Sequence, residues 1–228
     1  MEGLLTAVEK QHGAAARRLV EDALAFMRHA HEGQERADTT PFHKHPEAVA
    51  QILVDQRHAD PELLVAALLH DVVEDTPVTL EAIRSRFGEE IAFLVDAVTD
   101  VGKHDSKSAL PLVERTQRTH EKVLAAGQKD PRVFLIKTAD RLHNLKTMRA
   151  LTPERQRRLL HEAKEFHTKI ARDVGAEQLA AILEEIVDDF LDEDDEKKNG
   201  QDPLEPSRPH VRSKAQHLNR ARTSRRNP

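Results

Sequence analysis

The 228-residue sequence contains no cysteine, no tryptophan and no tyrosine, and only seven phenylalanines. The absence of cysteine excludes disulfides, thiolate metal ligands and a cysteine nucleophile. It is compatible with a reducing compartment, so we expect a cytoplasmic protein. With so few aromatic residues, a hydrophobic core must consist mainly of Leu, Val, Ile and Ala. No apolar run reaches the roughly 18 residues that a membrane helix needs, and the N-terminus lacks the features of a signal peptide.

The net charge of −5 hides an asymmetry between the C-terminal segment and the rest of the chain. Residues 207–228 contain seven Lys or Arg and no acid, so the remaining 206 residues carry 28 basic and 40 acidic residues, a net charge of −12. An acidic body argues against nucleic acid as the main ligand. We therefore look for a small-molecule site.

Apolar residues recur with helical spacing along most of the chain, and strand alternation is nowhere sustained, so the predicted fold class is all-α. One stretch, LLVAALL at residues 63–69, is apolar on all sides, which indicates a helix buried in the centre of the fold. A final long helix is expected to break near Gly175. The expected helices cover approximately residues 19–30, 46–53, 63–75, 79–87, 91–98, 112–126, 133–148 and 153–190.

Two segments fall outside this pattern. Residues 101–110 are polar and are expected to form a loop. Beyond Phe190 the sequence becomes low in complexity, with seven acids among residues 188–196 followed by spaced prolines. We interpret 1–192 as one domain and 193–228 as a disordered, acidic-then-basic tail, because such a composition cannot bury enough apolar surface to fold.

Ionisable residues close two helices that are otherwise apolar. The central helix ends in HDVVED at residues 70–75, and in the helix at 133–148 Asp140 follows a core run, with Asn144 four residues on. Residues four apart share a helix face. Since burial of unpaired charge is costly, these groups need partners or a metal ion.

Together with His45, which precedes a helix, these residues form a plausible two-His, two-carboxylate metal site: His45, His70, Asp71 and Asp140. Imidazole and carboxylate without thiolate suit Mn²⁺, Fe²⁺ or Zn²⁺, which would polarise a phosphoryl group. His43 competes with His45, and Asp140 could instead pair with Arg141 or Lys137. Seven other histidines are expected to be surface or satisfied core residues rather than ligands: His29, His31, His58, His104, His143, His161 and His167.

One turn after the His-Asp pair, Glu74 and Asp75 would open onto the same cavity. There they could orient or deprotonate a water molecule and assist the leaving group.

At this point the sequence resembles the hydrolase domain of the Rel/Spo family, which degrades the alarmone (p)ppGpp. A generic HD phosphohydrolase would share only the His, the His-Asp pair and the later Asp. The resemblance is more specific than that and covers about residues 20 to 150. It rests on AHEGQ at 30–34, Arg36, PFHKHP at 41–46, VAQIL at 49–53, AALLHDVVEDT at 66–76, LVDAVT at 94–99, and DPRVFLIKTADRLHN at 130–144 followed by Thr147.

The resemblance implies one Mn²⁺ per chain, held by the four residues chosen above, and a catalytic role for Glu74 and Asp75. It also implies that Arg36 packs on the guanine base and that Asn144 and Thr147 line the nucleoside pocket. The reaction would remove the 3′-pyrophosphate of ppGpp or pppGpp, giving GDP or GTP. Because the chain stops where long relatives would begin their synthetase domain, it looks like a small, hydrolase-only enzyme.

The sequence departs from the family at several positions, among them Phe42 in place of a tyrosine and a less basic segment after Pro111, where Arg115 and Arg118 remain as candidates for phosphate contacts. These changes leave two alternatives open. The same site could act on another nucleotide such as NADPH, or the chain could be a non-catalytic nucleotide-binding regulator. The intact acidic pair at 74 and 75 argues against the second.

Overall fold

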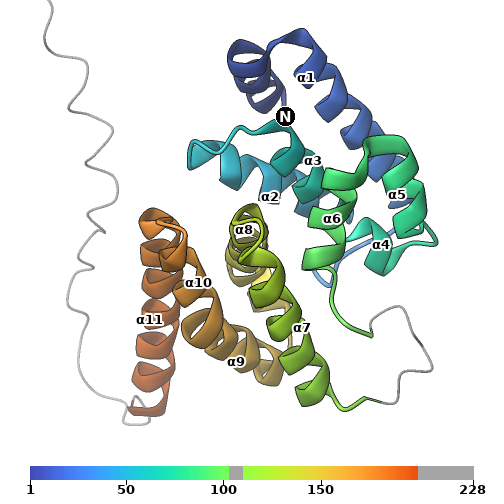
Figure 1. Ribbon diagram of the computed structural model, residues 1–228. Helices are drawn as coiled ribbons and strands as arrows, with labels where there is room; N and C mark the ends of the chain where they lie inside the picture. Colours follow the sequence, from blue (N-terminus) through green and yellow to red (C-terminus); the bar gives the residue numbers. More distant parts are fainter. Residues whose placement is uncertain (103–109, 200–228) are drawn as a thin grey trace, which may run out of the picture. The chain divides into compact units, whose positions relative to one another are not determined.

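The computed structural model describes residues 1–102 and 110–199, without the side chains of 193–199. Most of the predicted loop at 101–110 and residues 200–228 of the predicted tail lie outside the described residues. The described part is helical, as predicted, and no helix in it is long and apolar enough to cross a bilayer (Figure 1). Its helices are α1 (Glu2–Ala30), α2 (Lys44–Asp55), α3 (Pro61–Leu69), α4 (Val72–Asp75), α5 (Leu80–Phe87), α6 (Glu89–Val98), α7 (Leu112–Gly127), α8 (Arg132–Thr147), a 3₁₀ turn η1 (Met148–Ala150), α9 (Pro153–Glu162), a π-helix η2 (Ala163–His167), α10 (Thr168–Asp173) and α11 (Glu177–Asn199).

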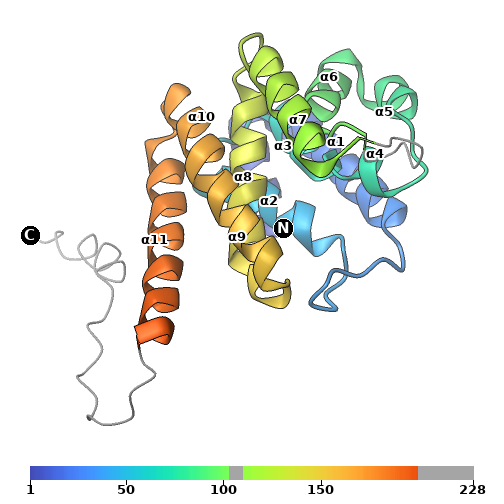
Figure 2. The same cartoon turned by 90° about the horizontal axis from the view of Figure 1, so that it is seen from below.

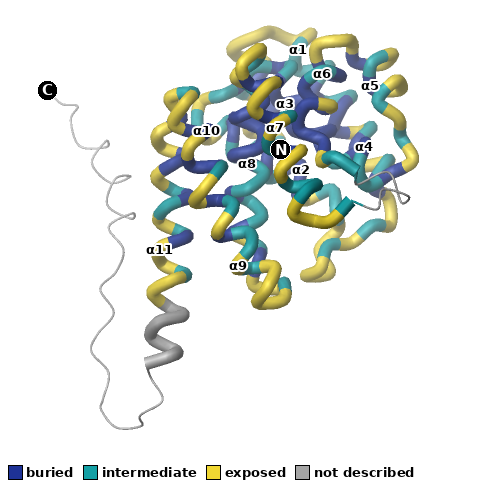
Figure 3. The backbone as a smooth tube through the Cα atoms, turned by 60° about the horizontal axis from the view of Figure 1, so that its bottom comes forward, coloured by how far each residue is buried: buried dark blue, intermediate teal, exposed yellow. Residues whose placement is uncertain are grey.

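Helix α3 is the centre of the hydrophobic core, as its all-round apolar sequence predicts. Eight of its nine residues, all but Glu62, are buried, and it packs on α1, α2, α6 and α8 (Figure 3). The Asp60 side chain caps its first turn by accepting from Leu63 N at 2.8 Å, and Pro61 stands at its first position. Both features are typical of a helix N-terminus.

The expected continuous helix over 63–75 is wrong, because the chain leaves helical pairing at His70 and Asp71. His70 Nδ1 donates to Ala67 O at 2.8 Å, the carbonyl that the Asp71 N–H would meet in an uninterrupted helix. A new turn, α4, begins at Val72 and is paired back to Asp71 O through the N–H groups of Glu74 and Asp75. The His-Asp pair thus lies in a break between two helices rather than on one helix face.

Both ends of the described chain differ from the sequence-based boundaries. Helix α1 begins at Glu2 and bends at Gly13, whose φ of 85° favours glycine, and Arg17 pairs across the bend with Glu2 and Glu9. The break near Gly175 is confirmed, with φ of 70° between α10 and α11. Helix α11 continues to Asn199, so the predicted tail boundary at 193 falls inside a helix.

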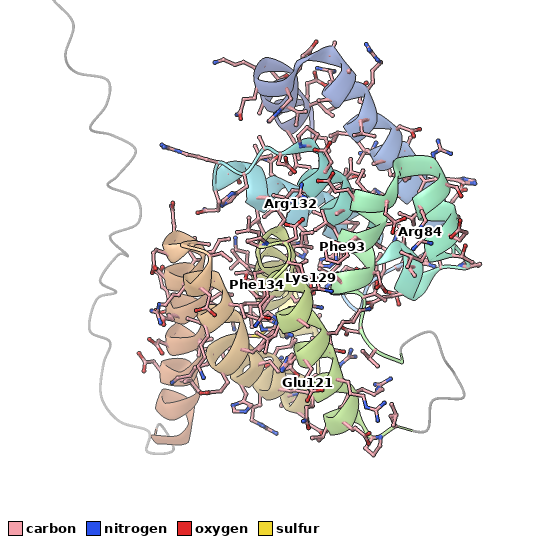
Figure 4. The ribbon with its side chains drawn as sticks, in the orientation of Figure 1. Arg84, Phe93, Glu121, Lys129, Arg132 and Phe134 are labelled. Carbon is pink, nitrogen blue, oxygen red and sulfur yellow. The ribbon has the colours of Figure 1, made fainter. Side chains whose placement is uncertain are left out.

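Helix α8 is fixed at its N-terminal end by ion pairs and close packing. Arg132 pairs with Glu90, Asp130 and Asp60, the residue that caps α3, at 2.6, 2.6 and 3.1 Å. Phe134, labelled with Arg132 in Figure 4, packs where α7 ends at Gly127. These contacts set how α8 lies against α3 and α7, the helices that surround the site.

A Gly127→Ala substitution should destabilise the fold. The added Cβ would lie 2.1 Å from Cε1 of the buried Phe134 ring, so the two helices would have to separate. We expect a loss of about 1–3 kcal/mol in the free energy of unfolding, measured by urea denaturation. Gly3→Ala is the matched control, because nothing lies within 4 Å of its Cβ and alanine favours helix. Equal stability of the two variants would contradict this packing.

Candidate metal and nucleotide site

Three segments bring together the four side chains predicted to hold a metal ion. His45 comes from the first turn of α2, His70 and Asp71 from the break after α3, and Asp140 from α8. These helices pack on one another, as Figure 2 shows from below. His45 Nε2 lies 3.2 Å from His70 Nε2, 3.1 Å from Asp140 Oδ1 and 3.4 Å from Asp71 Oδ2. His70 Nε2 lies 3.3 Å from Asp71 Oδ2 and 3.7 Å from Asp140 Oδ1.

The spacing of these atoms fits a divalent cation. A triangle formed by the Nε2 atoms of His45 and His70 and Oδ1 of Asp140 contains a point about 2 Å from each corner, the usual length of a bond from Zn²⁺ to imidazole or carboxylate. Asp71 Oδ2 lies close to both imidazole nitrogens. The two rings are almost fully buried, and the carboxylates are about 15% exposed. The cluster could therefore hold a metal ion largely out of solvent.

Each imidazole is oriented by its second nitrogen. His70 Nδ1 donates to Ala67 O, which leaves Nε2 unprotonated toward the cluster in the neutral ring. His45 Nδ1 lies 2.7 Å from Nδ1 of His143, so one ring donates and the other accepts. Burial, with the nearby His45 and Arg36, lowers the pKa of His143 to about 4, so a neutral His143 can accept the proton of His45 Nδ1.

His143 is not among the candidate ligands, as expected, but it contacts one of them, His45, a role that the sequence analysis did not assign to it. The one available signal is that it lies three residues after Asp140, on the same side of α8. The preference for His45 over His43 agrees with the structure, because His43 lines a separate groove at the surface.

The electrostatics of the cluster reflect opposite charges held close together. Burial would raise the pKa values of Asp71 and Asp140, but the two imidazoles outweigh it and hold both carboxyls ionised. Burial likewise opposes protonation of His70, and the two carboxylates overcome it and raise its pKa. The carboxylates thus favour a positive charge at the centre of the cluster. Either a protonated His70 or a bound cation would supply that charge.

Glu74 and Asp75 lie beside the cluster. Together with Asp71 they offer three carboxylate oxygens within 4.8 Å of one another. Glu74 Oε1 accepts from the backbone N–H of Asp100, and Asp75 O accepts from Gln34 Nε2 at 2.8 Å. The turn α4 therefore holds both acids at the cavity, as predicted.

Lys137 stabilises this acidic side. Its buried Nζ donates to Asp100 Oδ1 and to Val98 O, each at 3.1 Å. Burial would lower its pKa, but Asp100, Asp140 and Glu74 outweigh it, so the ammonium stays charged. Arg141 pairs with Glu162 at 2.6 Å. The alternative of Asp140 as the ion-pair partner of Lys137 or Arg141 is thus not what the structure shows.

The cluster opens into a cavity of about 600 Å³ that also contains the predicted substrate residues. Asn144 connects the two parts: its Nδ2 donates to Asp140 Oδ1 at 2.7 Å, and its Oδ1 accepts from Arg36 at 2.8 Å. The guanidinium of Arg36 stands 5.9 Å from the Phe42 ring centroid. Thr147 and Arg115 line the same cavity, whereas Arg118 is absent from its lining and pairs with Glu114.

Residues 23–177 match the family described as HD domain. The chain belongs to the HD-domain family. The guanosine-3′,5′-bis(diphosphate) 3′-pyrophosphohydrolase of Haemophilus influenzae is 40% identical over 161 residues, 71% of this chain and 23% of that protein. The bifunctional (p)ppGpp synthase/hydrolase SpoT of Escherichia coli K12 is 40% identical over 167 residues, 72% of this chain and 23% of that protein.

A solved structure, described as "A metazoan ortholog of SpoT hydrolyzes ppGpp and plays a role in starvation responses", superposes with a TM-score of 0.65 at 32% identity. It covers 75% of this chain and 95% of its own. The resemblance to the Rel/Spo group within the HD family is thus confirmed. The chain spans about a quarter of the length of the two curated relatives.

Asp140→Ala should abolish metal binding at this HD site, because it removes a carboxylate that lies close to both imidazoles. We expect affinity for Mn²⁺, measured by calorimetry on the full chain, to fall by more than about 100-fold. Asp96→Ala removes an exposed carboxylate that pairs with Lys122 and should leave affinity unchanged. Metal binding by Asp140→Ala at the wild-type level would remove Asp140 from the site.

His143→Ala should weaken metal binding without removing a ligand. It deletes the group that orients His45, and loss of such a partner typically lowers metal affinity by about 10–100-fold. His161→Ala, an exposed histidine on α9, is the control. If His143→Ala bound Mn²⁺ as tightly as the control, the contact between the two rings would have no role in the site.

Proposed function

We propose that this protein is a metal-dependent (p)ppGpp 3′-pyrophosphohydrolase, which converts ppGpp or pppGpp to GDP or GTP and pyrophosphate. The observation that carries the proposal is that one cavity joins the His-Asp cluster, the Glu74–Asp75 pair and the Arg36–Asn144 contact. Relatives that are about 40% identical bear this activity in their names, which supports the choice of substrate.

In this proposal His45, His70, Asp71 and Asp140 hold a single ion. Two imidazoles with two carboxylates favour a borderline transition metal over Mg²⁺, which prefers all-oxygen ligands, and we propose Mn²⁺. When bound, the ion would supply Lewis acidity toward the phosphoryl oxygens.

Glu74 and Asp75 would handle the protons of the reaction. Hydrolysis adds water to the inner phosphorus of the 3′-pyrophosphate and breaks its bond to the 3′ oxygen, which takes up a proton. Glu74 is held by the Asp100 N–H, and Lys137 fixes Asp100 in turn, so the carboxylate has a defined place at the cavity wall. A positioned carboxylate of this kind can orient or deprotonate the water and return a proton to the leaving oxygen.

The nucleoside would lie against Arg36, Asn144 and Thr147. A planar guanidinium can stack on a purine base, and the hydrogen bond from Arg36 to Asn144 keeps that plane in place. Arg115, on α7, would contact a phosphate group. Because Asn144 also bonds to Asp140, the position of the nucleoside is tied to the position of the ion.

The proposal includes a cytoplasmic location and a small-molecule ligand rather than nucleic acid. The net charge of −12 over residues 1–206 would repel a polyanion, whereas the arginines that line the cavity supply local positive charge for a nucleotide.

A substrate panel with defined metals tests the function. The purified full chain, freed of metal with EDTA and reloaded with Mn²⁺ or Mg²⁺, is assayed with ppGpp, pppGpp, NADPH and GTP. We expect release of pyrophosphate from ppGpp and pppGpp, faster with Mn²⁺. Release of phosphate from NADPH alone would favour the alternative substrate, and tight ppGpp binding without turnover would favour a non-catalytic regulator.

Glu74→Gln and Asp75→Asn should each lower kcat for ppGpp by about 10²–10⁴-fold, because they keep size but remove a positioned acid or base. Metal content should persist, since neither residue is among the proposed ligands. Glu81→Gln on α5, an exposed acid paired with Arg84, should have wild-type kcat. Retention of more than about a tenth of kcat in both site variants would rule out the catalytic roles.

A further inference from the structure

The cavity has a second polar region that the proposed roles do not use. It lies between α7, α8 and the α9–η2 segment, and we name it the basic arm, defined by His120, Arg141, Arg158 and His167. One acid, Glu162, accompanies these four residues. Its partners are Arg141 at 2.6 Å and, at the longer distance of 3.8 Å, Arg158. One carboxylate faces two guanidinium groups, so the arm carries excess positive charge.

Arg141 has hydrogen-bonding capacity that the described part of the chain leaves unused. Its side chain is 11% exposed, and Nη2 is occupied by Glu162. Nε and Nη1 are buried and find no acceptor among the described residues. Buried donors without acceptors are costly, and a guanidinium is suited to phosphate oxygens. Glu162 therefore leaves two donors of Arg141 for a further anionic group.

The imidazoles of His120 and His167 line the same space. His120 stacks face to face on Phe166 with ring centroids 3.8 Å apart, and His167 Nδ1 donates to Glu162 O at 3.0 Å. Burial lowers the pKa of both rings. Phe166 and His167 belong to the π-helix η2, a rare conformation that is frequent at functional sites.

The direction of the arm relative to the ion site follows from α8. Asp140, Asn144 and Thr147 form one stripe along this helix, and Lys137 and Arg141 form the next stripe, about 100° around it. In the first stripe, Asn144 accepts a hydrogen bond from Arg36. In the second stripe, Arg141 donates to Glu162 on α9, and Lys137 donates to Asp100, which follows α6.

A nucleoside and the distal phosphoryl group lie on opposite sides of the P–O bond that is broken. If the first stripe holds the nucleoside, the distal phosphate must extend into another part of the cavity. The stripe of Lys137 and Arg141 lines another part of the cavity, and it begins next to the ion site, because Lys137 lies near Asp140 and Glu74.

We propose that the basic arm binds a diphosphate group, namely the 3′-pyrophosphate of the substrate and then the released pyrophosphate. This inference rests on the proposed function for the identity of the diphosphate. The same chemistry is present in the 5′-diphosphate of the nucleotide, so inorganic pyrophosphate and GDP serve as separate probes.

Calorimetric titration of the Mn²⁺-loaded full chain with each probe tests the proposal. Arg158→Gln should weaken pyrophosphate binding by about 10-fold, as expected for loss of one charge-assisted contact, and leave GDP binding unchanged. Arg158 is 40% exposed, so its substitution should not unfold the chain. Arg157→Gln, one residue earlier on α9 and absent from the cavity lining, is the matched control and should bind both probes as wild type.

Arg141→Gln should have a larger effect on pyrophosphate than Arg158→Gln, with the melting temperature measured alongside because it also breaks the contact with Glu162. Wild-type pyrophosphate affinity in Arg158→Gln, or an equal loss in Arg157→Gln, would overturn the proposal. A loss of GDP affinity with pyrophosphate affinity intact would also overturn it, since the arm would then hold the 5′-diphosphate.

The assay separates this inference from the proposed function. If the wild-type chain binds pyrophosphate through Arg158 but does not hydrolyse ppGpp, the diphosphate site stands and the proposed reaction is wrong. If the chain hydrolyses ppGpp and Arg158→Gln binds pyrophosphate normally, the reaction stands and the basic arm is not a diphosphate site.

Discussion

Two imidazoles and two carboxylates meet in the interior of a helical bundle whose other buried side chains are mostly aliphatic. Burying such groups without compensation would cost several kcal/mol per charge. The fold compensates by holding a carboxylate oxygen of Asp71 and one of Asp140 within 4 Å of both imidazole nitrogens, and a bound cation would complete that compensation. The break after α3 lies at the two residues that reach the cluster, His70 and Asp71: the helical hydrogen bonding is interrupted there, while the backbone torsions of both residues stay in the right-handed helical region.

Helix α8 connects the cluster to the rest of the site. Its Asp140 belongs to the cluster, its Asn144 bonds both to Asp140 and to Arg36, and its Lys137 holds Asp100, whose N–H holds Glu74. The helix is fixed at its start by Arg132, which pairs with the residue that caps α3. A single helix thus sets the relative positions of the ion, the acids and the nucleoside wall, and small shifts of α8 would affect all three.

The sequence predicts most of the helices and the residues of the cluster, because both depend on local patterns. An all-apolar helix closed by charged residues identifies His70 and Asp71, and the same anomaly identifies Asp140. Features that depend on contacts between distant segments were missed. The partner of His45 is His143, 98 residues away, and the break at His70 involves a side chain that competes for a backbone carbonyl. The π-helix that presents His167 has no signature in apolar spacing, and His120 becomes notable only once Phe166 is found against it.

The account depends on the buried cluster being a cation site. Anomalous diffraction at the manganese edge, from crystals of the full chain grown with Mn²⁺, tests this most directly. We predict one strong peak per chain, about 2.0–2.3 Å from Nε2 of His45, Nε2 of His70 and carboxylate oxygens of Asp71 and Asp140. A peak held only by Asp71, Glu74 and Asp75, or no peak in the cavity at saturating Mn²⁺, would contradict the account.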